Sequence, residues 1–193
     1  MARAWFYGLA CGIALALAQP LARADEPGLK ALAAGGHVAI VRHGLTTPGV
    51  GDPEGFRLDQ CATQRNLIEE GRAEARALGR LLRERQIKIE RVLSSEWCRC
   101  RETAQLMEVG EAETLPALNN LYGRHERREG QLREMRAVIS AWKGSGTLIL
   151  VSHGSTIGAL TGIHPATAEG VVLAPAPDTA EGFRMVGRIG PAG

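Results

Sequence analysis

Short apolar runs alternate with longer amphipathic stretches along this chain. Runs rich in Val, Ile and Leu are typical of buried strands, and the last two are joined by a turn around Pro177 and Asp178. A shorter extended piece is expected at residues 114–118. The predicted strands are residues 37–41, 87–93, 147–151, 171–173 and 183–189.

The segments between the earlier strands have the periodicity of helices. Within residues 69–85, Arg and Glu occupy one face and apolar side chains the other, namely Ala73, Ala77, Leu78, Leu81 and Leu82. The predicted helices are residues 69–85, 98–109 and 130–142. Strands alternating with helices of this length predict an α/β layer structure with a mostly parallel sheet. In such sheets, ligands bind at the carboxyl ends of the strands.

The first residues have the pattern of a secretory signal peptide. Arg3 supplies a positive charge, an uncharged apolar run covers residues 4–17, and Ala22 and Ala24 place small residues before a cleavage site. The alternative is a membrane anchor, but the run is shorter than the roughly 20 residues that span a bilayer. We therefore expect a signal peptide at 1–24, cleaved after Ala24, and one domain at 25–193. This predicts a periplasmic or secreted protein with no stable membrane insertion.

Composition and charge fit one globular domain and exclude a general affinity for nucleic acid. Of the 193 residues, 45% are hydrophobic and 23% are charged. The chain has 23 Lys and Arg against 21 Asp and Glu. Because Arg3 and Arg23 leave with the signal peptide, the mature chain is neutral, so any preference for anions has to come from a local site.

Three cysteines remain after the signal peptide: Cys61, Cys98 and Cys100. An oxidising compartment favours one disulfide and one free thiol. Cys98 and Cys100 point to different faces of a helix, so Cys61 pairs with Cys98 or, as the alternative, with Cys100. No His or Cys cluster has metal-ligand spacing, so we expect no metal and no cofactor.

Polar groups follow three of the predicted strands. Arg42-His43-Gly44 follows the first strand, Ser94-Ser95 the second, and Ser152-His153-Gly154 the strand at 147–151. A single such His is usually a structural residue, but two of them beside an Arg indicate a site. Imidazole can act as a nucleophile, and Arg binds phosphate in bidentate fashion. Arg99, in the turn into the next helix, can reach back over this edge, although by itself it is typical of a solvated helix start.

These segments resemble the histidine phosphatase superfamily, which includes the cofactor-dependent phosphoglycerate mutases. The resemblance covers about residues 36–175 and rests on four motifs in order: Val41-Arg42-His43-Gly44, the helix entry at 66–75, the Ser-x-x-x-Arg-x-x-x-Thr-Ala segment at 95–104, and Ser152-His153-Gly154. It implies a phosphoglycerate mutase-like, three-layer α/β/α fold. It also implies that His43 becomes phosphorylated while Arg42, Arg99 and His153 hold the phosphoryl oxygens.

The chain departs from that family at two places. The mutases carry Glu where Asn120 stands here, so the general acid has to lie elsewhere. We expect Glu126 in this role, with Glu129 next; a third possibility is that no acid exists, which would suit phosphoramidates. Leu45 replaces the Glu that follows Arg-His-Gly in the mutases, which argues against mutase activity.

The resulting expectation is an exported phosphatase that hydrolyses phosphomonoesters, small or in the cell envelope, through a phosphohistidine on His43 and without a metal. The alternatives are a phosphohistidine or phosphoramidate phosphatase and a non-catalytic phosphate-binding protein. A basic cluster either attracts a further anionic part of the substrate or simply solvates a loop; it comprises Arg124, His125, Arg127 and Arg128. The sequence indicates neither the substrate's identity nor the oligomeric state.

Overall fold

The computed structural model describes residues 26–191. The predicted signal peptide, with its cleavage after Ala24, lies outside the described residues. No helix within residues 26–191 is long and apolar enough to cross a membrane.

A six-stranded sheet forms the middle layer, with strand order β3-β2-β4-β1-β5-β6. The strands are β1 (Val38–Arg42), β2 (Ile89–Ser94), β3 (Ala112–Thr114), β4 (Thr147–Ser152), β5 (Gly170–Pro175) and β6 (Phe183–Ile189). The first four pair in parallel, whereas β5 is antiparallel to both β1 and β6. The prediction of a mostly parallel sheet is therefore confirmed, and the late pair of strands is the antiparallel hairpin at one edge.

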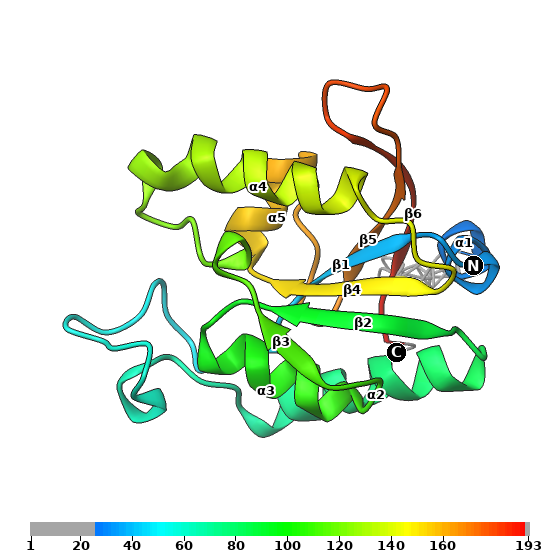
Figure 1. Ribbon diagram of the computed structural model, residues 1–193. Coiled ribbons are helices and arrows are strands. Elements are labelled where there is room, and N and C mark those ends of the chain that lie inside the picture. Colours follow the sequence, from blue (N-terminus) through cyan, green and yellow to red (C-terminus); the bar gives the residue numbers. More distant parts are fainter. Residues whose placement is uncertain (1–25, 192–193) are drawn as a thin grey trace, which may run out of the picture.

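Helices cover both faces of the sheet and give the three layers that the resemblance implied (Figure 1). One face carries α1 (Glu26–Ala34), α2 (Glu69–Glu84) and α3 (Cys98–Met107); the other carries α4 (Arg128–Ser140) and α5 (Gly154–Thr161). The apolar stripe of α2 explains its position, because its Leu78 and Leu82 are fully buried against the sheet. At Gly79 a Cβ would overlap the carbonyl oxygen of Met107, so this glycine allows α2 and α3 to pack closely.

Two helices and one extended segment differ from the prediction. Helix α1 buries Leu29 and Leu32, and α5 follows His153 directly; neither was predicted. The sequence of α5 includes Gly154 and Gly158, which are poor helix formers, so packing of its apolar face decides its conformation. The prediction of an extended piece at 114–118 is wrong, because strand β3 ends at Thr114 and a 3-10 turn (Pro116–Leu118) follows.

Candidate active site

The two histidines predicted at strand ends lie next to each other. Strands β1 and β4 are parallel neighbours in which Arg42 pairs with Ser152, and the backbone N–H of His43 donates to the Ser152 carbonyl at 3.0 Å. The ring centroids of His43 and His153 are 5.3 Å apart, with ring planes at 68°. Parallel register thus brings together two residues that are far apart in the chain.

A pocket of about 160 Å³ opens beside these rings. It contains the four residues expected to bind a phosphoryl group and, in addition, Arg65, Asn120 and Tyr122, to which the sequence analysis gave no role in the site. Its full lining is Arg42, His43, Gly49, Val50, Gly51, Arg65, Arg99, Asn120, Tyr122, His153, Gly154 and Ser155.

His43 is held as a neutral imidazole in one tautomer. Its Nδ1 lies 2.8 Å from the carbonyl oxygen of Gly44, which can only accept, so Nδ1 carries the proton and Nε2 keeps its lone pair. Burial, and then the positive charges of Arg99, Arg42 and Arg65, lower the pKa of His43 to about 3, although the hydrogen bond to Gly44 acts in the opposite direction. The ring is therefore ready to act as a nucleophile at neutral pH.

Glycines of two of the motifs, Gly44 and Gly71, approach each other closely next to His43. A Cβ on Gly44 would overlap the carbonyl of Gly71, and a Cβ on Gly71 would overlap the backbone of Leu45. The chain leaving β1 can therefore pass directly against the first turn of α2. This close approach fixes the Gly44 carbonyl that sets the tautomer of His43.

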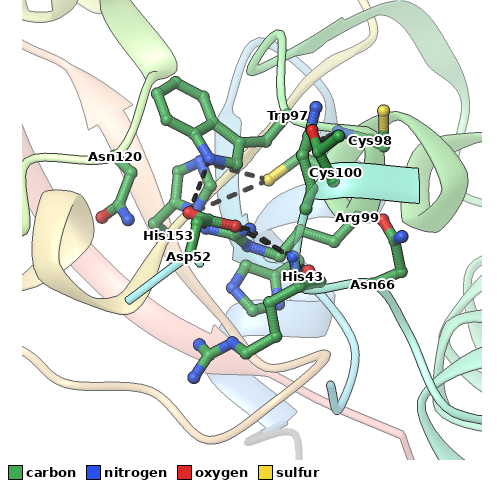
Figure 2. Close-up of polar contacts among 12 residues, drawn as sticks. His43, Asp52, Asn66, Trp97, Cys98, Arg99, Cys100, Asn120 and His153 are labelled. Atoms are coloured by element: carbon green, nitrogen blue, oxygen red, sulfur yellow. Dashed lines mark hydrogen bonds and ion pairs between the residues drawn. The ribbon is translucent and has the colours of Figure 1, made fainter. Parts of the chain in front are cut away.

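His153 lies in the pocket wall with its polar atoms already engaged (Figure 2). Its Nε2 is 2.8 Å from Ser95 Oγ and 3.5 Å from the thiol of Cys100. The Ser95 hydroxyl donates to Asn119 Oδ1, so it accepts from the Nε2–H of His153. Burial first, then the coupling to the neighbouring ring of His43 and the charge of Arg99, hold the pKa of His153 well below its usual value.

Asp52 pairs with Arg99, and nothing in the sequence linked these two residues. Nη1 of Arg99 is 2.7 Å from Oδ1 of Asp52, and their side chains are 1% and 3% exposed. The same carboxylate accepts hydrogen bonds from Trp97 Nε1 at 2.9 Å and from the backbone N–H of Arg65 at 3.1 Å. Burial alone would raise the pKa of Asp52, but these hydrogen bonds and the charge of Arg99 hold it below its usual value. Asp52 is therefore an ionised carboxylate that orients Arg99.

Three guanidinium groups surround the pocket, and each keeps an unused donor. The Nε–H groups of Arg42, Arg65 and Arg99 are buried and have no hydrogen-bond partner among residues 26–191. Elsewhere on these side chains, Arg42 donates to the Pro165 carbonyl at 3.0 Å and Arg65 donates to the Gly49 carbonyl. A buried donor without a partner is unfavourable, and an oxyanion in the pocket is a ligand that can satisfy all three. The sequence offered one signal for Arg65, its place beside the helix-entry motif.

The carboxylates expected to act as the acid lie outside this pocket. Glu126 is 70% exposed in the 3-10 turn His125–Arg127, and with Glu129 it lines a separate hollow of about 540 Å³. Glu126 and Glu129 therefore do not line the pocket that holds His43, and the expected role of Glu126 as the acid stays a prediction. Asn120 occupies the pocket instead, and its Oδ1 accepts from Ser155 Oγ at 2.7 Å. No Asp or Glu of the described chain lines the pocket.

A disulfide ties the loop that carries Asp52 to the start of α3. Cys61 and Cys98 are bonded, with their Cα atoms 5.6 Å apart, and Cys100 is a buried free thiol. The favoured pairing is confirmed and the Cys61–Cys100 alternative is wrong. Because Cys98 precedes Arg99, the bridge anchors the loop beside this arginine. Within the described part of the chain, no three His, Cys, Asp or Glu side chains are grouped as metal ligands.

Comparisons with known proteins agree with this arrangement. Residues 38–145 match the family model of the histidine phosphatase superfamily, branch 1. A structure of the protein histidine phosphatase SixA with tungstate matches at a TM-score of 0.59 and 22% identity, over 80% of this chain and 97% of that one. A mycobacterial glucosyl-3-phosphoglycerate phosphatase matches at a TM-score of 0.55 and 19% identity, over 81% and 98%. At these identities the two structures show a shared fold. No curated protein sequence matches the chain.

Proposed function

The chain belongs to the histidine phosphatase superfamily, and from this premise we propose that it is a phosphatase whose His43 takes the phosphoryl group from the substrate. The observation that carries the proposal is the fixed tautomer of His43: Nδ1–H is bound to the Gly44 carbonyl at 2.8 Å, inside a pocket with three guanidinium groups. The neutral Nε2 supplies the electron pair, and the arginines stabilise charge on the transferring oxygens.

The proposed reaction has two displacements at phosphorus. Nε2 of His43 attacks in line, the P–N bond forms as the bond to the leaving group breaks, and the leaving group departs with that electron pair. Water then attacks the phosphohistidine, Nε2 departs with the electrons of the P–N bond, and one proton of the water passes to solvent. Arg42, Arg65 and Arg99 are the groups that bind the equatorial oxygens in both steps.

The preferred substrates, we infer, have a phosphorus–nitrogen bond, as in phosphohistidine. An alkoxide is a poor leaving group unless an acid protonates it, and the pocket is lined by Asn120 rather than a carboxyl group. A phosphorylated imidazole needs no such acid, because its second ring nitrogen takes a proton from water and the ring leaves neutral. The fold shared with a protein histidine phosphatase supports this choice.

Phosphomonoester hydrolysis remains the second candidate, on one specific observation. The hollow that contains Glu126 and Glu129 shares Asn120 with the pocket of about 160 Å³ beside His43, which we call the phosphoryl pocket. A bound alcohol could therefore extend toward these carboxylates. We also propose that the protein is exported to the periplasm or secreted, and its disulfide supports an oxidising compartment.

Substrates that differ in the bond to phosphorus distinguish the two candidate phosphatase functions. The chain is assayed in EDTA with a phosphohistidine peptide, phosphoramidate and an alkyl phosphate, beside His43→Ala, Glu126→Gln and Glu129→Gln. Turnover of the first two that disappears in His43→Ala and survives both Glu variants is the expected result. Loss of alkyl phosphate turnover in Glu126→Gln would favour the second candidate. Tight phosphate binding without any turnover would replace both with a phosphate-binding protein.

A further inference from the structure

A second hollow of about 390 Å³ adjoins the phosphoryl pocket. The two share Tyr122 and Ser155, so a substrate whose phosphoryl group lies against His43 can extend its leaving group into the second hollow. Its lining is Leu121, Tyr122, Gly123, His125, Arg128, Ser155, Gly158, Ala159 and His164. We call this hollow the basic hollow, because Arg128 and two histidines line it and no Asp or Glu does.

The three basic side chains of this hollow are exposed and available to bind a ligand. Among the described residues, none of His125, Arg128 and His164 forms a side-chain hydrogen bond or ion pair. Arg128 is also the first residue of α4, where the positive end of the helix dipole opposes a cation. Helix stability therefore does not explain its position.

The hollow that contains Glu126 and Glu129 has a different charge. There, Arg124, Arg127 and Arg133 are accompanied by four carboxylates: Glu96, Glu126, Glu129 and Glu134. Of these two hollows, only the basic hollow is lined by basic side chains without a carboxylate.

The wall of the basic hollow is fixed to the phosphoryl pocket. The ring of His164 lies on Gly158 of α5, where a Cβ would come within 2.6 Å of Nδ1. The next residue, Pro165, accepts a hydrogen bond from Arg42 through its carbonyl at 3.0 Å. The wall of the basic hollow is thus held at a fixed position relative to Arg42, the arginine proposed to bind the transferred phosphoryl group.

We propose that the basic hollow is a subsite for a second acidic group, a carboxylate or a phosphate, on the leaving group of the substrate. This inference rests on the proposed function and narrows its substrate class to phosphorylated molecules with an additional negative charge near the transferred phosphoryl group.

Two aryl phosphates that differ only in charge test the subsite. The probes are 4-carboxyphenyl phosphate and the neutral 4-carbamoylphenyl phosphate, whose phenolates leave without an acid. Arg128→Gln removes the charge in the basic hollow, and Arg127→Gln is the matched control, because Arg127 is its exposed neighbour and lines the other hollow. Comparing the kcat/KM ratio of the probes between variants cancels their intrinsic reactivity.

The expected result is a decrease of about fivefold in the carboxylate-to-amide ratio in Arg128→Gln, the size of one solvent-exposed ion pair, with no change in Arg127→Gln. Turnover of both probes stays the same in Arg127→Gln. An unchanged ratio in Arg128→Gln, or an equal decrease in Arg127→Gln, overturns the subsite. The Kd ratio measured on His43→Ala backgrounds tests the same preference without turnover. Preserved binding preference without wild-type turnover would therefore refute the proposed function and retain the subsite.

Discussion

Asp52 and Arg99 form a buried bidentate ion pair, with Oδ1 2.7 Å from Nη1 and Oδ2 3.2 Å from Nη2. The carboxylate occupies the two terminal nitrogens and leaves the buried Nε–H of Arg99 without a partner. Asp52 therefore fixes the plane of the guanidinium (Figure 2), and the Nε–H is the donor that remains for an anion. In this way the loop before α2 sets the orientation of Arg99 in the pocket.

Asp52→Asn should therefore impair both binding and stability. Replacing one charge of a buried pair leaves Arg99 poorly compensated, which costs about 3 kcal/mol in the free energy of unfolding. With Arg99 no longer oriented, we expect kcat/KM to fall by about tenfold or more, mainly through KM. Denaturant unfolding and steady-state kinetics measure the two effects. Asp59→Asn is the control, because Asp59 on the same loop pairs with Arg57 at the surface, at 67% and 60% exposure; an equal loss in this variant would refute the positioning role.

Reduction of the Cys61–Cys98 disulfide should loosen the same loop. The bridge spans 37 residues of sequence, for which loop-closure entropy gives about 3–4 kcal/mol of stabilisation. We expect dithiothreitol to lower both Tm and kcat/KM of the wild type. The double variant Cys61→Ser/Cys98→Ser should start at these lower values and show no response to the reductant. A wild-type Tm that is indifferent to dithiothreitol would contradict the prediction.

The buried histidines should make stability depend on pH. The pKa of His43 is about 3 in the folded protein and ordinarily about 6.5, so in this interval it binds a proton only on unfolding. Its contribution to stability is complete above pH 6.5 and decreases as the pH falls toward 3, by about 1.4 kcal/mol per pH unit. Denaturant unfolding between pH 7 and 4 should show this slope, reduced in His43→Gln. An identical slope in both proteins would show that His43 does not titrate as described.

Asn120→Glu should add activity toward substrates with poor leaving groups. Asn120 lines the phosphoryl pocket and is 9% exposed, so a glutamic acid there would place a proton donor near the leaving group. General acid catalysis contributes about a hundredfold or more, so alkyl phosphate turnover should rise by a factor of that order. Phosphoramidate turnover should change much less. Asn120→Gln controls for side-chain length, and an equal rise in that variant would exclude the acid as the cause.

Local patterns were sufficient for the framework of this protein. The apolar run at 147–151 became a fully buried strand, and the stripe of Leu78 and Leu82 placed α2 on the sheet. Both depend on periodicity and on burial of apolar side chains, which are encoded over short stretches. The histidines followed from the same information, because parallel strands bring their carboxyl ends to one edge.

What only the tertiary structure decided lies in the loops. Asp52 meets Arg99 across 47 positions, and Glu126 turns to solvent although the chain places it six residues after Asn120. The conformation of such segments is set by distant contacts, including the Cys61–Cys98 bridge and the close approach of Gly44 to Gly71. These contacts join residues that are distant in the chain, so a local sequence pattern does not predict them. The sequence by itself therefore determined the sheet and the position of His43 at its edge, whereas the folded chain decided which charges surround this histidine.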